Sequence, residues 1–121
     1  MDELARVDAI AQAELVASGQ LSAHELLEAA IARLEAARHL NAVIADLFDR
    51  GRAQAAALDA SGALRTGTAG PLAGVPFLIK DLGQDYRGYP TSSGSRSLRN
   101  HVATENATVV QRFLDAGLVI F

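Results

Sequence analysis

The sequence predicts an α/β protein in which helices come first and a strand, a loop, a helix and a second strand follow. Twenty of its 24 alanines lie in residues 1–70, and eight of its ten glycines lie at position 62 or beyond. Alanine favours helix, whereas glycine punctuates strands and loops. Two apolar runs, 75–79 and 118–121, flank an amphipathic segment, a pattern typical of parallel strands covered by helices.

The leading region, about residues 1–69, is predicted to be mainly helical. Apolar residues recur at helical spacing in its first segment, and Ser22 with Glu25 fits a capping box at the start of the second. A short, partly β-branched stretch predicts a strand between the second and third helices. The expected elements are helices over residues 3–17, 22–39 and 48–60, and a strand over residues 41–45.

The second region, about residues 70–121, is predicted to begin a central sheet. Its first apolar run, 75–79, suits a strand buried on both faces. A long glycine- and serine-rich loop over 83–97 precedes a helix over 106–116, and Gly117 suits a left-handed helix cap. Because the run 118–121 is left without neighbouring strands, we expect residues 1–121 to be an incomplete domain, the N-terminal part of a larger one.

Composition narrows the classes of function. Half of the residues are hydrophobic, 21% are charged and the net charge is −3, so the chain is globular and has no general attraction for nucleic acid. The absence of cysteine excludes disulfides and thiolate chemistry. The three histidines show no metal-ligand spacing, so we expect neither metal nor cofactor. With no signal sequence or apolar span, we expect a cytoplasmic protein with no membrane partner.

Lys80 directly follows the first apolar run and is the leading catalytic candidate. In open α/β sheets, ligands bind beyond the carboxyl ends of the strands. Partial burial at such a position disfavours the charged form of a lysine and makes a neutral amine available as a base. On position alone, however, a solvated lysine paired with Asp81 is the commoner outcome.

The hydroxyl-rich loop from Thr91 to Ser95 is the second candidate. Its hydroxyls and backbone donors suit substrate binding, and Lys80 next to one of its serines would suit a Ser-Lys pair. An ordinary polar loop explains the same composition equally well.

Five blocks of the sequence resemble the amidase signature family. The segment Gly70–Asp81 matches its Leu-x-Gly-x-Pro-x-x-x-Lys-Asp block, and the segment Gly88–Ser95 resembles its Gly-x-x-Thr-Thr-x-Gly-Ser loop, with Ser92 in place of the usual second threonine. The three remaining blocks are similar to the family's leading helices, first strand, and the helix and strand after the loop. They cover residues 21–27, 40–44 and 108–120.

The resemblance implies an α/β/α fold with a mixed central sheet and an amide hydrolase that uses a Ser-Ser-Lys relay. Lys80 would be the catalytic lysine, and Thr91 and Ser92 would bind substrate. The nucleophile and the bridging serine belong to a stretch beyond residue 121, so we expect this chain to be inactive alone. Its substrate would be a small-molecule amide.

Two alternatives to a small-molecule amidase remain open. One is an amidotransferase A-type subunit that performs transamidation; the other is an inactive truncated or split-gene product. Possible protein partners are a second copy of the chain, giving a homo-oligomer, or a complementing C-terminal polypeptide.

Overall fold

The computed structural model describes residues 3–121, and it confirms that helices come first and that a strand, a loop, a helix and a second strand follow. Short 3-10 turns, η1 to η3, separate some of the regular elements. The elements in chain order are η1 (Glu3–Arg6), α1 (Ala9–Ala17), α2 (Ala23–Ala36), η2 (Arg38–Leu40), α3 (Phe48–Ser61), α4 (Ala63–Thr66), β1 (Pro76–Phe77), η3 (Arg96–Leu98), α5 (Thr108–Asp115) and β2 (Val119–Ile120).

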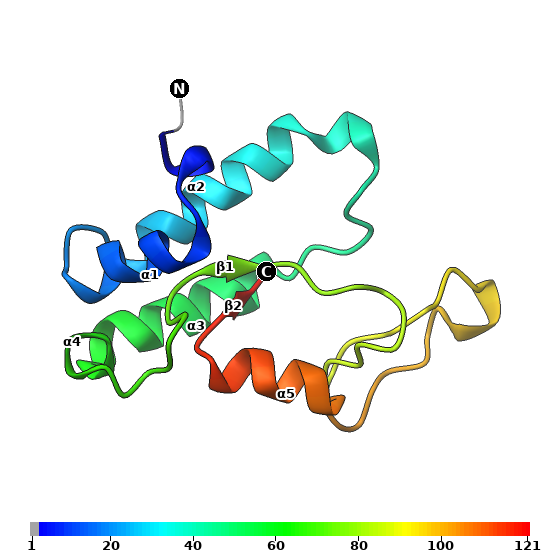
Figure 1. The fold of residues 1–121 in the computed structure, drawn as a ribbon. Coiled ribbons are helices and arrows are strands. Elements are labelled where there is room, and N and C mark those ends of the chain that lie inside the picture. The colour runs from blue at the N-terminus through cyan, green and yellow to red at the C-terminus, as the bar shows by residue number, and fades with distance from the viewer. Residues whose placement is uncertain (1–2) are drawn as a thin grey trace.

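The two strands pair in parallel, as the strand–helix–strand pattern predicts, with Pro76 opposite Val119. The side chains of β2 alternate between two apolar layers. Val119 and Phe121 pack into a cluster with α2 and α3, whereas Ile120 packs with Val110 of α5 on the other face. Figure 1 shows α2 above the strands and α5 below them. The result is the start of an α/β/α sandwich.

The start of α2 is fixed from two directions. Ser22 and Glu25 form the predicted capping box, each satisfying a backbone N–H at the helix start. In addition, the carboxylate of Asp59 on α3 accepts hydrogen bonds from the N–H groups of Ala23 and His24, at 2.8 Å and 3.1 Å. Asp59 therefore ties the C-terminal part of α3 to the N-terminus of α2.

Gly117 and Gly74 lie where the segments before β1 and β2 come into close contact. Gly117 has φ of 88° and serves as the predicted left-handed cap after α5. A Cβ atom on Gly117 would lie 2.4 Å from the carbonyl oxygen of Ala69. Its own carbonyl accepts a hydrogen bond from the N–H of Gly74 at 2.9 Å, which brings the segment before β1 against the segment before β2.

Four predicted elements differ from the structure, three of them in the leading region. The helix expected over 3–17 is interrupted, because Asp8 caps α1 by accepting a hydrogen bond from the N–H of Ala11, so that only a 3-10 turn precedes it. The helix expected to end near His39 stops at Ala36, and η2 follows. The strand expected over 41–45 is wrong: this segment has no strand partner.

The strand expected over 75–79 is also shorter than predicted. Only Pro76 and Phe77 pair with β2, and both are partly exposed, while Leu78 keeps 45% of its surface exposed. The apolar run indicated burial on both faces, but β1 is hydrogen-bonded to one strand and packed mainly on one side. By contrast, both residues of β2 are buried, as the sequence predicts.

Candidate active site

Lys80 lies just past the C-terminal end of β1, as the sequence predicts, and its side chain is exposed. It is the only lysine of the chain. Its backbone N–H donates to the side-chain oxygen of Gln84 at 2.8 Å, which closes the turn that follows. The position of the Lys80 backbone is therefore set by β1 on one side and by Gln84 on the other.

The structure brings Lys80 and the two predicted substrate-binding residues, Thr91 and Ser92, to one hollow of about 780 Å³. Its walls are mostly apolar, with a few polar groups near Lys80, the usual composition of a small-molecule site. Two backbone segments, 42–45 and 78–82, line it together with Gln84, Tyr86, Arg99 and Ile120.

The carboxylate of Asp81 holds Ser92 in place at the wall of this hollow. It accepts a hydrogen bond from the N–H of Ser92 at 2.6 Å and another from the Ser92 hydroxyl. The Ser92 hydroxyl, helped by the N–H groups of Ser92, Gly94 and Ser93, holds the pKa of Asp81 below its ordinary value. Within residues 3–121 no ion pair joins Asp81 to Lys80, so the solvated Lys–Asp pair does not form.

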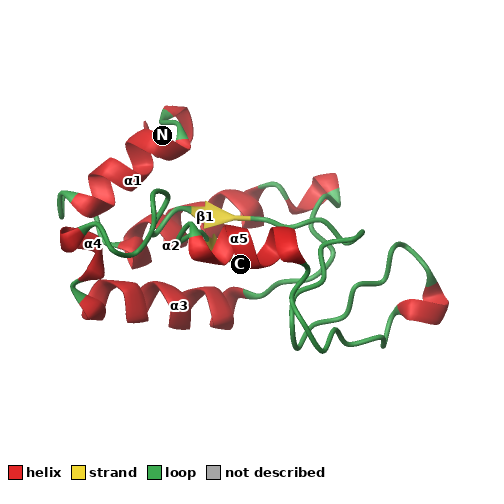
Figure 2. Ribbon diagram, turned by 60° about the horizontal axis from the view of Figure 1, so that its bottom comes forward, coloured by secondary structure: helices red, strands yellow, loops and turns green. Residues whose placement is uncertain are grey.

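The chain between β1 and α5 leaves the body of the molecule as an arm, here defined as residues 88–103 (Figures 1 and 2). Its base is closed by hydrogen bonds from Gly88 N–H to the Ala103 carbonyl at 2.8 Å and from Ala103 N–H to the Tyr89 carbonyl at 2.9 Å. Pro90 and Val102 form an antiparallel bridge beside them. The arm is thus a tied loop, and it presents Thr91 and Ser92 to the hollow.

An arginine from α3 braces the wall formed by the arm. The guanidinium of Arg50 lies over the ring of Tyr86, 4.3 Å from its centroid, and over that of Tyr89, at 5.3 Å. It also donates a hydrogen bond to the Tyr86 hydroxyl. The two tyrosine rings stack on each other. This contact fixes the aromatic wall next to Lys80.

Sequence reasoning missed Gln84, the Arg50–tyrosine contact and the role of Asp81 in holding the arm. The only available signal was the Asp81 carboxylate beside Lys80, followed by a hydroxyl-rich loop. No pattern links Arg50 to Tyr86, which lies 36 residues later in the sequence, or to Tyr89.

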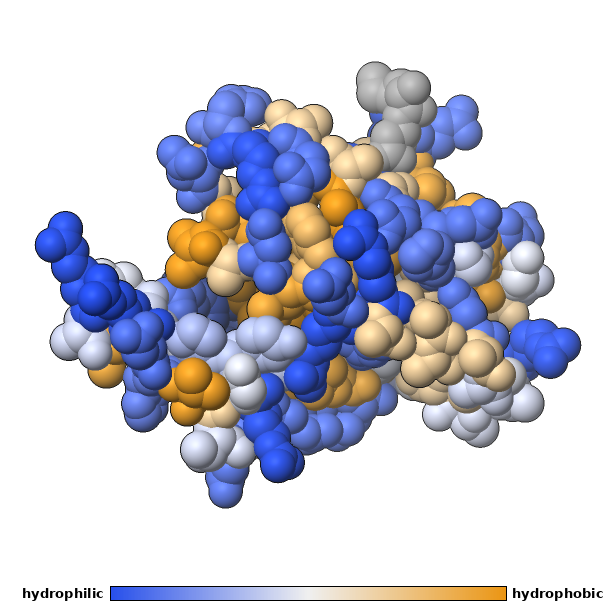
Figure 3. Space-filling view, turned by 180° about the vertical axis from the view of Figure 1, so that it is seen from behind, coloured by the Kyte–Doolittle hydropathy of each residue, from blue (hydrophilic) through white to orange (hydrophobic). Residues whose placement is uncertain are grey.

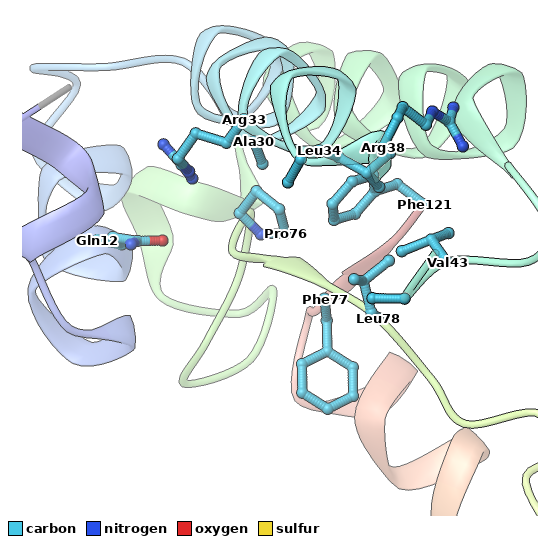
Figure 4. A pocket seen from close by; sticks show the side chains of 12 residues that line it. Gln12, Ala30, Arg33, Leu34, Arg38, Val43, Pro76, Phe77, Leu78 and Phe121 are labelled. Carbon is cyan, nitrogen blue, oxygen red and sulfur yellow. The ribbon is translucent and has the colours of Figure 1, made fainter. Parts of the chain in front are cut away.

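A second hollow of about 450 Å³ lies beside β1 and carries no comparable chemistry. Figure 4 shows Pro76, Val43 and Phe121 around it, with Phe77 directed away towards α5. One of its two arginines, Arg38, pairs with Glu35 and Asp46. Figure 3 shows a face of the molecule on which hydrophobic residues are exposed among hydrophilic ones. The hollow with Lys80 is therefore the candidate active site.

In this chain Lys80 lies three residues past the end of the parallel strand β1, and a turn and a glycine-punctuated hydroxyl loop follow it. This is the arrangement expected of the amidase signature family of α/β proteins. Residues 25–121 match the Amidase family profile. The chain belongs to this family.

The relatives that match the chain include proteins named as amidotransferase subunits and proteins named as hydrolases. It is 44% identical over 112 residues to the A-type subunit of the glutamyl-tRNA(Gln) amidotransferase of Deinococcus deserti, covering 93% of this chain and 22% of that protein. It is 40% identical over 116 residues to "6-aminohexanoate-cyclic-dimer hydrolase" of a Pseudomonas species, again covering 93% and 22%.

Solved structures of the family superpose well on this chain. The peptide amidase of Stenotrophomonas maltophilia does so with a TM-score of 0.86 at 29% identity, over all of this chain and 25% of that one. A bacterial aryl acylamidase does so with a TM-score of 0.85 at 32% identity, over 95% and 24%. The chain therefore spans less than a quarter of the first relatives that it matches, and it has their α/β fold. No helix within residues 3–121 is long and apolar enough to cross a membrane.

Proposed function

We propose that this chain supplies the catalytic lysine, Lys80, of a Ser-Ser-Lys amidase whose two serines lie outside residues 1–121. The supporting observation is the place of Lys80: past the carboxyl end of β1, among the residues that line the hollow, and without an ion-pair partner within residues 3–121. A neutral amine at this place takes a proton from a bridging serine, which takes one from the nucleophile.

The nucleophile attacks an amide carbonyl, and the C–N bond breaks as the acyl-enzyme forms, so that the amine leaves with a proton from the relay. Water then hydrolyses the acyl-enzyme, which releases the acid and restores the serine hydroxyl. Nothing in the described residues replaces that nucleophile. Ser92 donates its hydroxyl to Asp81, and the hydroxyls of Ser95 and Ser97 bond to each other. The chain alone is therefore expected to hydrolyse no amide.

Hydrolysis is preferred over transamidation on tRNA. Relatives with both kinds of name match the chain. The net charge of −3 gives no general attraction for a polynucleotide. The substrate is accordingly a small amide that fits a mostly apolar hollow, and the location is the cytoplasm.

The test joins residues 1–121 to the C-terminal four-fifths of the 6-aminohexanoate-cyclic-dimer hydrolase, and assays this hybrid and the chain alone with the cyclic dimer, an anilide and a primary amide. The hybrid should turn over an amide, and Lys80→Ala should lower kcat at least about a hundredfold. Arg99→Ala, which removes another cation lining the same hollow, should leave kcat within about twofold. Turnover by the chain alone, or an active Lys80→Ala hybrid, would overturn the proposal.

A further inference from the structure

The Asp81 carboxylate joins two parts of the candidate site that are otherwise separate. Asp81 follows Lys80 directly, four residues past the end of β1. Ser92, which donates hydrogen bonds to Asp81, lies 11 residues further along the chain, within the arm. Both bonds from Ser92 reach the same carboxylate, one from the backbone and one from the hydroxyl.

The backbone around Ser92 is shaped to surround this carboxylate. Ser93 has φ of 51° and Gly94 has φ of 71°, so two successive residues adopt the left-handed conformation. A positive φ is uncommon for serine and needs a compensating interaction. Successive N–H groups in such a turn can converge on an anion, and the N–H groups of Ser93 and Gly94 help to lower the pKa of the Asp81 carboxyl.

We propose that Asp81 is a positioning residue for Lys80, which holds the 92–94 turn of the arm against the segment after β1 that carries the lysine. This inference rests on the proposed function, since it assigns Asp81 a task toward the lysine of that site. The two hydrogen bonds from Ser92 occupy the Asp81 carboxylate and so keep it from pairing with the lysine amine. A charged partner would hold that amine in its protonated form.

The hydrogen bonds between Asp81 and Ser92 also fix the backbone at Lys80. The Lys80 N–H is bonded to Gln84, in the same turn that Asp81 begins, so one end of the turn is held by Gln84 and its first residue by the arm. Loss of the Asp81 contact frees both the arm and this turn. An error of about 1 Å in the placement of a reacting group costs on the order of a hundredfold in rate.

The first experiment measures backbone amide exchange in the 121-residue chain by mass spectrometry, for peptides over residues 91–95 and 80–84. Asp81→Asn and Ser92→Ala should both speed exchange of the first peptide, the former by roughly ten- to hundredfold, and Asp81→Asn should speed exchange of the second. Ser92→Thr keeps the hydroxyl and should restore slow exchange. Thr66→Ala, which removes a hydroxyl outside the arm that bonds to Ala63 and Thr68, should change neither peptide.

The second experiment uses the hybrid enzyme. Asp81→Asn should lower kcat by roughly a hundredfold with KM changed much less, and Ser92→Thr should keep near-normal kcat while Ser92→Ala does not. If Lys80→Ala proves harmless, the proposed function fails. If Lys80→Ala abolishes turnover but Asp81→Asn is harmless, the positioning role fails. Unchanged exchange over residues 80–84 in Asp81→Asn, or fast exchange of the 91–95 peptide in the unmodified chain, also overturns it.

Discussion

Gly117 provides the sharpest stability prediction, because its substitution by alanine combines two separate costs. An alanine at φ of 88° is in the left-handed region, which costs about 1–2 kcal/mol. Its Cβ would also lie 2.4 Å from the carbonyl oxygen of Ala69 and 2.6 Å from the Cα of Ala73, distances that real Cβ atoms essentially never show. Those neighbours are backbone atoms and must shift, at a further cost of about 1–3 kcal/mol.

Gly67 supplies the matched control. Its φ of 71° imposes a similar backbone cost, but a Cβ there would meet nothing within 4 Å. Gly67→Ala should therefore show only the first cost, and the difference between the two variants measures the close approach beside Gly117.

The assay is urea unfolding followed by circular dichroism, at a concentration low enough to avoid association. Gly117→Ala should unfold at a midpoint roughly 1 M lower than Gly67→Ala, since the slope for a chain of this size is about 1–3 kcal/mol/M. Equal midpoints for the two variants would refute the claim that the crossing of the segments before β1 and β2 is closely packed.

Two further predictions concern the helices and the exposed surface. Asp59→Ala should destabilise the chain by about 1 kcal/mol in the same assay, because the N–H groups at the start of α2 lose their acceptor. The control is Asp49→Ala, which changes a fully exposed side chain and should cost much less. Equal losses of stability in the two variants would contradict the capping role of Asp59. The isolated chain should bind a hydrophobic dye through its uncovered apolar side chains, and Ile44→Lys, at a residue 72% exposed, should lower that binding without lowering the unfolding midpoint; no dye bound by the unmodified chain would count against this.

Local chemistry explains what the sequence could predict. The capping box at Ser22 and the left-handed cap at Gly117 depend on neighbours within a few residues, and both form as expected. The buried strand 118–121 and the place of Lys80 follow from apolar runs, whose meaning depends little on distant partners.

Long-range partners explain what the sequence could not predict. The segment 41–45 has strand composition, but a strand also needs a hydrogen-bonding neighbour, and none lies beside it within residues 3–121. The sequence does not show that Asp81 binds Ser92, because the two residues meet only after the arm folds back. The contact of Arg50 with Tyr86 and Tyr89 likewise depends on α3 meeting the start of the arm and the residues just before it.

The most direct measurement of the central claim is kcat for Lys80→Arg in the hybrid enzyme. Arginine keeps the positive charge and much of the length of lysine, but its guanidinium does not deprotonate at working pH and cannot serve as a base. If Lys80 relays a proton, Lys80→Arg should be as inactive as Lys80→Ala, with slow amide exchange over residues 80–84 showing that the fold is kept. Near-normal kcat for Lys80→Arg would contradict the account, since the residue would then contribute only its charge.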